Sequence, residues 1–278
     1  MSDRITVERD GGVADVRLNR ADKMNALDPA MFAALIATAD ELAADPSLRC
    51  VVLSGEGKSF CAGLDFASFQ QMGSGDRTDD GDGGDRGVRD ITKPMDGRIT
   101  HQGQQAVYGW TSLPVPVIAA VHGHALGGGI QLALGADIRI VAPDATMSVL
   151  EIRWGLIPDM TGTQALVNLV GIDVAKELTF TGRMISGDEA HELGLATKLS
   201  DDPRTAALEM AGDIAAKSPH AIRAAKRLFN DASKVSVADG FARERAEIAQ
   251  LIGSPNQVEQ VMAFFEKRAP NFADPETG

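Results

Sequence analysis

Two glycine-rich segments of the chain have the composition needed to place backbone N–H groups around one ligand atom. Residues 59–65 follow the apolar run 50–53, and residues 123–131 contain three consecutive glycines before an apolar run. Glycine allows close approach of a ligand, and the first N–H groups of a helix have no partner within the helix. Two such segments on successive strands could direct two N–H groups at one oxygen, which is the arrangement of an oxyanion hole. A close-packed turn without a ligand is the alternative.

Two histidines near these segments suggest a metal site only weakly. His122 and His124 would share one face of a strand, but no third ligand follows at a useful spacing. We therefore expect no metal, and a structural role for both. His101, His191 and His220 are expected to be isolated and solvated.

Two other ligand-binding patterns are incomplete. Residues 57–59 end like a phosphate-binding Walker A loop, but the required earlier glycine falls at Val52. Residues 73–87 are rich in glycine and aspartate, yet the twelfth position counted from Asp80 is Ile91 rather than the glutamate of a calcium loop. The composition of 73–87 predicts a surface insertion.

The elements that must position these segments alternate between strands and helices in the first 200 residues. Asp28 is a good N-cap and Pro29 suits the first position of a helix, which continues with apolar residues at helical spacing. Alternating or continuous apolar runs predict strands at 5–8, 13–18, 50–53, 115–121, 138–141 and 147–150. We expect an α/β core over residues 1–200.

Helical periodicity dominates the rest of the chain. Four amphipathic runs are expected to be helices, at 204–217, 220–230, 237–252 and 257–267. We therefore predict a second unit, a C-terminal helical subdomain over residues 201–278.

Composition excludes several classes of protein. The net charge of −12 argues against a nucleic-acid binder, whose surface is usually basic. Two cysteines exclude a disulfide scaffold, and no apolar run is long enough to cross a membrane. The first residues lack the apolar run of a signal peptide, so we expect a soluble cytoplasmic protein.

Five segments occur in an order that is similar to the crotonase superfamily, also called the enoyl-CoA hydratase/isomerase family. They are 18–27 (LNRADKMNAL), 60–65 (FCAGLD), 123–129 (GHALGGG), 151–158 (EIRWGLIP) and 265–268 (FEKR). The resemblance covers nearly the whole chain and implies a spiral of ββα units followed by a helical trimerisation region. It also implies an acyl-CoA thioester substrate, no cofactor beyond that coenzyme A, and a homotrimer or a dimer of trimers.

The resemblance also implies roles for individual residues. The N–H groups of Leu64 and Gly128 would form the oxyanion hole for the thioester oxygen. Backbone near Ala26 and Ala62, together with Lys23, would face the coenzyme A nucleotide. The position of Lys267 implies contact with a coenzyme A phosphate across a subunit interface. An ordinary solvated lysine is the alternative for Lys23 and for Lys267.

The acid–base positions implied by the family decide between reactions. Hydratases of this family use two carboxylates; one of these positions is Glu151 here, but the other is Gln131. An amide exchanges no proton near neutral pH, so Gln131 can orient a water or the thioester but cannot act as acid or base. Asp159 lies eight residues after Glu151, as in the dienoyl-CoA isomerases of the family, although those enzymes carry an acid at the Gln131 position. A structural ion pair is the alternative for Glu151, and a turn or N-cap for Asp159.

Three functions are therefore compared, and thioester hydrolysis or another reaction of the family also stays open, because an oxyanion hole serves any enolate or tetrahedral oxyanion. A double-bond isomerase needs only one base to move a proton between two carbons, so it is favoured. An enoyl-CoA hydratase acting through Glu151 alone, with weak or altered activity, is the second. A non-catalytic acyl-CoA-binding protein is the third. We expect 73–87 and 91–105 to border the acyl pocket.

Overall fold

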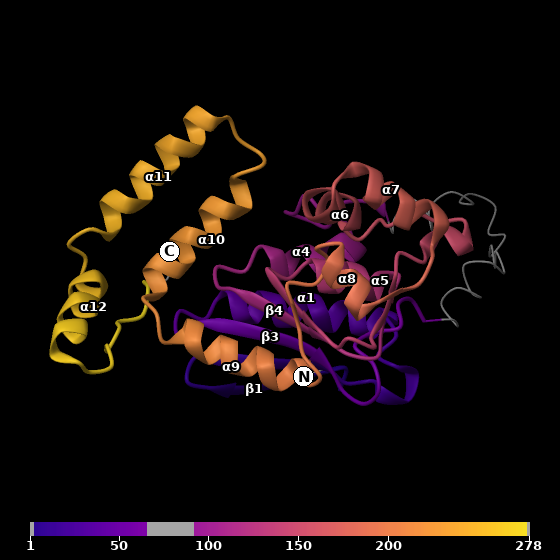
Figure 1. Ribbon diagram of the computed structural model, residues 1–278, viewed down its shortest axis with the longest axis horizontal. Coiled ribbons are helices and arrows are strands. Elements are labelled where there is room, and N and C mark those ends of the chain that lie inside the picture. The colour runs from indigo at the N-terminus through magenta and orange to yellow at the C-terminus, as the bar shows by residue number, and fades with distance from the viewer. Residues whose placement is uncertain (1–2, 66–91, 277–278) are drawn as a thin grey trace.

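The centre of the protein is a six-stranded sheet with the strand order β1-β2-β3-β4-β6-β9 (Figure 1). The computed structural model describes residues 3–65 and 92–276. Only β1 and β2 run antiparallel, and every later neighbour in this sheet is parallel. The strands are β1 (Ile5–Asp10), β2 (Val13–Leu18), β3 (Cys50–Gly55), β4 (Val117–Val121), β6 (Ile138–Val141) and β9 (Lys198–Leu199).

Both faces of the central strands are buried, as the continuous apolar runs predict. In β3, Val51 and Leu53 pack into the main core, whereas Cys50 and Val52 pack into a second cluster on the other face. This alternation follows from the two-residue period of a strand. The main core is covered by α1 (Pro29–Ala43), α4 (Gln102–Thr111) and α5 (Gly128–Leu134).

The protein also has a second, three-stranded sheet, and helices α6 to α8 follow its strands β7 and β8 in the chain. It has the order β5-β7-β8, formed by β5 (His124–Leu126), β7 (Thr146–Ser148) and β8 (Ile185–Ser186). The remaining elements of this region are η2 (Glu151–Trp154), α6 (Gly162–Val170), α7 (Ile172–Thr181) and α8 (Gly187–Glu192). The short helix η1 (Ala21–Lys23) instead follows β2.

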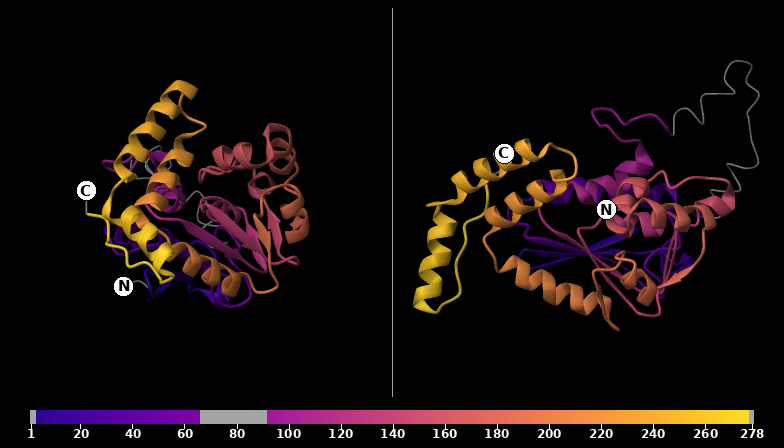
Figure 2. Two further views of the ribbon diagram at one scale, coloured as in Figure 1. Left: turned by 60° about the vertical axis from the view of Figure 1, so that its left-hand side comes forward. Right: turned by 45° about the horizontal axis from the view of Figure 1, so that its top comes forward.

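The four predicted C-terminal helices are confirmed and divide into two groups. They are α9 (Pro203–Ala215), α10 (Pro219–Asp231), α11 (Val237–Leu251) and α12 (Pro255–Glu266). Helix α9 lies across the sheet and buries Ala207 and Ala211 in the second cluster, whereas α11 and α12 project to one end of the molecule (Figures 1 and 2). A division of the chain at residue 200 stays a prediction.

Two strand predictions were wrong at one end. The strand expected at 115–121 begins at Val117, because Pro114 and Pro116 have no N–H to donate. The strand expected at 147–150 ends at Ser148, and Leu150 is instead the N-cap of the short helix η2. The predicted cap is confirmed, since the Asp28 side chain accepts from Met31 N.

Two further expectations concern the acyl pocket and membrane-spanning helices. Residues 73–87 and Ile91 lie outside the described residues, so their predicted place beside an acyl pocket stays a prediction. Across 3–65 and 92–276, no helix combines the length and apolar character needed to cross a membrane.

Candidate functional site

The candidate site lies where β2, β3 and β4 end, because parallel strands bring their carboxyl ends to one edge of the sheet. Asn25 fastens two of the segments that follow these strands. Its Oδ1 accepts from Arg20 N at 2.8 Å, and its Nδ2 donates to Glu56 O at 2.9 Å and Ser59 O at 2.8 Å. Asn25 is fully buried at φ 56°, a left-handed conformation that asparagine tolerates better than most residues. This role of Asn25 was not predicted from the sequence, although Asn25 belongs to the family-like segment 18–27.

Gly63 brings the segment 59–65 directly against the segment 123–131. Its φ is +88°, and a Cβ at this position would lie 2.5 Å from Leu126 O and 3.6 Å from Gly128 N. Only glycine therefore permits this approach. Leu64 stands next to Gly63, so the two residues predicted to act together, Leu64 and Gly128, belong to backbone segments that touch.

The N–H groups of Leu64 and Gly128 are both available. Leu27 pairs with the residues on either side of Leu64, through Gly63 O at 2.8 Å and Asp65 N at 3.0 Å, which leaves the Leu64 N–H outside this pairing. Gly128 is the first residue of α5 and has no acceptor in the helix. Among the described residues, neither N–H has a hydrogen-bond acceptor.

Gln131 and Glu151 form a direct, buried hydrogen bond. Gln131 Nε2 donates to Glu151 Oε1 at 2.6 Å, and Gln131 Oε1 accepts from Met160 N at 2.8 Å and Gly162 N at 3.1 Å. The two backbone donors define the amide orientation, because they require an oxygen where a nitrogen would repel them. Gln131 is 1% exposed, and its hydrogen bonds connect Glu151 to the backbone of the loop after Pro158.

Glu151 is a buried carboxylate with one oxygen unused. It is 9% exposed, and within the described residues its Oε2 is buried without a hydrogen-bond partner and the carboxylate has no ion pair. Burial raises its pKa above the ordinary value of 4.5 for glutamate, the hydrogen bond from Gln131 opposes this rise, and the nearby charge of Asp159 adds to it. The structural ion pair that was the alternative for Glu151 is therefore absent from the described residues.

Asp159 lies in a different environment from Glu151. Its side chain is 58% exposed, and His101 Nε2 lies 4.0 Å from its Oδ2. The N-cap of α6 is Thr161, so the N-cap role considered for Asp159 is wrong. The expectation that His101 is isolated is also wrong, because its Nδ1 caps α4. His191 and His220 likewise have partners, Ala196 O at 3.0 Å and Asn256 Nδ2 at 2.8 Å.

Of the residues predicted to contact coenzyme A, three lie near the Leu64 segment of the site and one lies far from it. Ala62 N donates to Met24 O at 2.9 Å, which joins the segment around Lys23 and Ala26 to the Leu64 segment. Lys23 is exposed, and Ala26 and Ala62 flank this junction. Lys267 lies at the end of α12, on the side of the molecule away from α5 and α6 (Figures 1 and 2). Within one chain, Lys267 is therefore not brought to the site.

The histidines first considered as metal ligands have structural partners. His122 Nε2 lies 3.1 Å from Gly57 O, and His124 Nδ1 lies 3.0 Å from Ser59 Oγ. His122 therefore attaches the residue after β4, and His124 the start of β5, to residues 57–59. In the part of the chain that the structure describes, no cluster of three His, Cys, Asp or Glu side chains is arranged to hold a metal.

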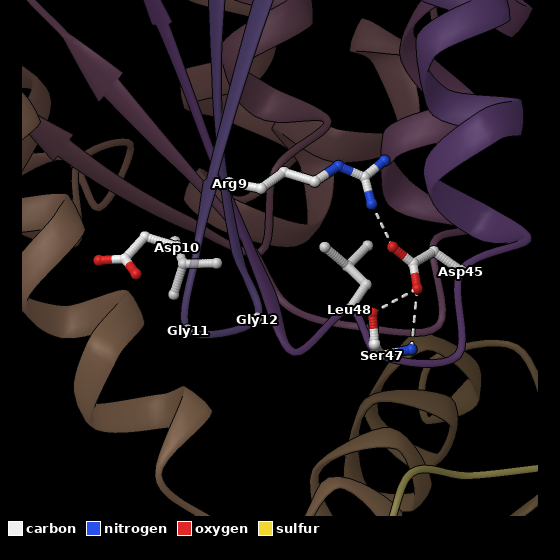
Figure 3. Close-up of a pocket in the computed structure, with 8 residues that line it drawn as sticks. Arg9, Asp10, Gly11, Gly12, Asp45, Ser47 and Leu48 are labelled. Atoms are coloured by element: carbon white, nitrogen blue, oxygen red, sulfur yellow. Dashed lines mark hydrogen bonds and ion pairs between the residues drawn. The ribbon is translucent and has the colours of Figure 1, made fainter.

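A small pocket of about 140 Å³ lies at the opposite end of the strands, at the turn between β1 and β2 (Figure 3). There Asp45 accepts from Arg9 and from both Ser47 N, at 2.9 Å, and Ser47 Oγ, at 2.6 Å. The carboxylate is thus already occupied by protein donors. None of the predicted site residues lines this pocket.

Comparison with known proteins gives matches along the whole chain. The sequence profile of the Enoyl-CoA hydratase/isomerase family matches residues 8–275. The mouse protein named enoyl-CoA hydratase domain-containing protein 2, mitochondrial, is 34% identical over 268 residues, covering 94% of this chain and 84% of the relative. Mouse methylglutaconyl-CoA hydratase, mitochondrial, is 33% identical over 272 residues, covering 95% of this chain and 81% of the relative.

Solved structures agree over the same length. An enoyl-CoA hydratase from Bacillus anthracis superposes with a TM-score of 0.82 at 31% identity, covering 97% of this chain and 98% of that one. An enoyl-CoA hydratase from Polaromonas sp. JS666 gives a TM-score of 0.83 at 30% identity, with 97% and 99% covered. The mixed α/β fold with a helix-rich C-terminal region, expected from the sequence, is therefore confirmed.

Proposed function

The chain belongs to the enoyl-CoA hydratase/isomerase family, and from this premise we propose that it moves a double bond in an acyl-CoA thioester. The family assignment makes it an acyl-CoA enzyme, and the exact reaction is our proposal. In it Glu151 is the base, and the N–H groups of Leu64 and Gly128 hold the thioester oxygen. Asp159 is the second proton carrier, and Gln131 orients Glu151.

The reaction needs no net gain or loss of protons. Glu151 accepts a proton from one carbon of the acyl chain, and the electron pair of that C–H bond moves through the conjugated system onto the thioester oxygen. The two N–H groups stabilise the enolate that results. A proton then returns to another carbon, and the double bond has migrated. If Glu151 returns the proton, the site is reset directly; if Asp159 returns it, Asp159 has first taken a proton from solvent and Glu151 afterwards releases its own to solvent.

The observation that carries this proposal is the hydrogen bond between Gln131 and Glu151. It supports a site with one buried carboxylate whose second oxygen, Oε2, remains for substrate. Hydration requires one group to activate water and another to deliver a proton, whereas migration of a double bond can be completed by a single base. The amide at position 131 therefore favours the isomerase.

Proton exchange in deuterated water tests the proposal. A panel of enoyl-CoA esters should take up deuterium at the acyl carbons with the wild-type protein, and the Glu151→Gln variant should lose this exchange. If the wild type exchanges no protons with any ester, the isomerase is excluded. Binding of the esters without exchange, hydration or hydrolysis would instead support the non-catalytic acyl-CoA-binding protein.

Hydration through Glu151 alone is the second candidate, favoured by the names of the relatives. Mouse methylglutaconyl-CoA hydratase and the superposed bacterial proteins are named as hydratases. Incubation with crotonyl-CoA and with methylglutaconyl-CoA would reveal hydration as a loss of the conjugated enoyl absorbance. Turnover comparable to that of a two-carboxylate hydratase would favour this candidate over the isomerase.

We also propose that Lys23, the backbone of Ala26 and the carbonyl of Ala62 contact coenzyme A. Lys23 is exposed, and among the described residues Ala62 O accepts no hydrogen bond. Lys23→Ala should raise the KM for the acyl-CoA ester but leave the KM for a pantetheine thioester, which lacks the nucleotide, unchanged. An equal change for both substrates would argue for ordinary solvated lysine. No cofactor other than the coenzyme A of the substrate is proposed.

A homotrimer, or a dimer of trimers, is proposed from the exposed C-terminal helices. Helix α11 has no buried residue in the single chain, and α10 to α12 expose large apolar side chains. They include Phe229, Val237, Phe241, Ile248, Ile252, Phe264 and Phe265. Covering them requires a partner, and a second copy could also bring its Lys267 to this site. Sedimentation equilibrium would give the number of subunits. A cytoplasmic location stays a prediction, because the mouse relatives are named as mitochondrial.

A further inference from the structure

We propose that His101 is a positioning residue that holds the Asp159 carboxylate in place for proton transfer. The inference rests on the proposed function, because it assigns a support to the residue that carries the second proton there. His101 was expected to be solvated, but only 14% of its side chain is exposed.

The tautomer of His101 follows from its place at the start of α4. Its Nδ1 accepts from Gly103 N at 3.1 Å and Gln104 N at 3.5 Å, so the ring caps the helix. The Gln104 side chain accepts from His101 N in return, which completes a capping box. Since Nδ1 is the acceptor, the proton of the neutral ring is on Nε2. That N–H is on the side of the ring that faces Asp159.

The backbone around Asp159 is firmly held, whereas its side chain is not. Pro158 and Met160 are buried on either side, and Met160 N donates to Gln131. Met160 also packs near the first turn of α4, where its Cγ would lie 3.5 Å from a Cβ on Gly103. The first turn of α4 and the Asp159 loop therefore contact each other. Only the side-chain direction of Asp159 is left undetermined.

His101 is the group available to set that direction. Its Nε2 lies 4.0 Å from Asp159 Oδ2, slightly beyond hydrogen-bond length, so a small rotation of the exposed carboxylate closes the contact. Elsewhere in the described residues, Asp159 has no hydrogen bond or ion pair. Glu151, the other carboxylate of the site, repels it. The N–H donor of His101 offsets this repulsion and limits the rotamers of Asp159.

The test separates the two nitrogens of the ring. His101→Asn keeps a side-chain oxygen that caps the helix but removes Nε2, whereas His101→Ala removes both. The readout is the rate of deuterium incorporation at each acyl carbon of an enoyl-CoA ester. His191→Asn is the matched control, because it removes a histidine whose Nδ1 contacts a backbone carbonyl away from the site.

We expect His101→Asn to slow incorporation at one carbon, the carbon served by Asp159, by about tenfold, the equivalent of one hydrogen bond to a charged group. Exchange at the other carbon, KM and Tm should stay as in the wild type. In an Asp159→Asn background, His101→Asn should have no further effect. An equal effect of His101→Asn in both backgrounds, or no effect in either, would overturn the proposal.

A measurement without turnover distinguishes failure of this inference from failure of the proposed function. The ring nitrogens of His101 can be observed by 15N NMR of the full chain, assigned with His101→Asn. We expect the Nε2–H tautomer, and a changed Nε2 shift in Asp159→Asn but not in Asp188→Asn, an exposed aspartate on α8. An unchanged shift in Asp159→Asn would exclude the contact, whether or not the wild type exchanges substrate protons.

Discussion

The two carboxylates of the candidate site lie eight residues apart and have opposite surroundings. Glu151 belongs to an interior half, in which its Oε1 accepts from the Gln131 amide and lies 3.4 Å from where a Cβ on Gly127 would be. Asp159 belongs to an outer half, where its side chain is 58% exposed and its nearest partner is His101. The position of the Glu151 carboxylate is thus fixed by the packing around it, whereas that of the Asp159 carboxylate depends on a single contact.

This difference shows how one short segment can provide two unlike acids. Burial favours the uncharged form of a carboxyl group, so Glu151 is a stronger base than an exposed carboxylate. Asp159 remains in contact with water and can exchange its proton with solvent. The interior half is thus suited to removing a proton from carbon, and the outer half to returning one.

The largest effect is expected from Glu151→Gln. This variant retains a side chain that can accept from Gln131 but cannot take a proton, so deuterium exchange should fall by about 10²–10⁴-fold. Asp159→Asn is the matched change in the outer half and should have a smaller effect, confined to one carbon. Equal losses at both carbons in the two variants would remove the distinction between the halves.

A smaller but still large effect is expected from Gly63→Ala. The new Cβ would approach Leu126 O to 2.5 Å at a positive φ, so we expect a loss of about 2–4 kcal/mol in the free energy of unfolding. Gly97→Ala is the control, since Gly97 has φ +71° but open space around it, and should cost only about 1 kcal/mol. Urea denaturation measures both values. Similar losses would show that the interior half is less tightly packed than described.

Gln131→Glu should have an intermediate effect on stability. It replaces the N–H that donates to Glu151 with a second carboxyl oxygen, so one proton must be retained between the two groups. We expect a loss of about 1–3 kcal/mol near neutral pH that is largely recovered in acid, where the extra proton is available. The same variant tests the argument against hydration: a marked gain in crotonyl-CoA hydration would show that the amide at position 131 limits hydration, whereas no gain would remove this support for the isomerase.

The smallest effect is expected in the pH profile. Because the folded-state pKa of Glu151 is raised above 4.5, the base becomes ionised only at higher pH, and exchange should rise with pH through this raised value. The free energy of unfolding should instead fall as pH rises. The contribution of Glu151 to it is complete below pH 4.5, where the carboxyl group is protonated, and is lost as pH rises through the folded-state pKa. Urea denaturation at several pH values measures this pH-dependent loss of stability. Glu151→Gln should abolish the loss, while Asp159→Asn should retain most of it.

Several features of the fold were predictable because they depend on local chemistry. The Asp28 cap, the strand over residues 13–18 and all four C-terminal helices follow from side-chain periodicity and from the donors and acceptors near each helix end. The ends of strands were less predictable. They depend on pairing with distant residues, as β7 shows by ending before Leu150.

The sequence by itself determined the inventory of the site: two glycine segments, one glutamate at position 151, and an amide at 131. Only the tertiary structure decided how these groups are paired. It placed Gln131 between Glu151 and the backbone of residues 160 and 162, left Glu151 Oε2 without a partner in the described residues, and brought His101 toward Asp159. The reason is that residue types set which bonds can form. Which bonds do form, and how much water remains around them, depends on segments that are 20 to 58 residues apart in the sequence and that folding brings together.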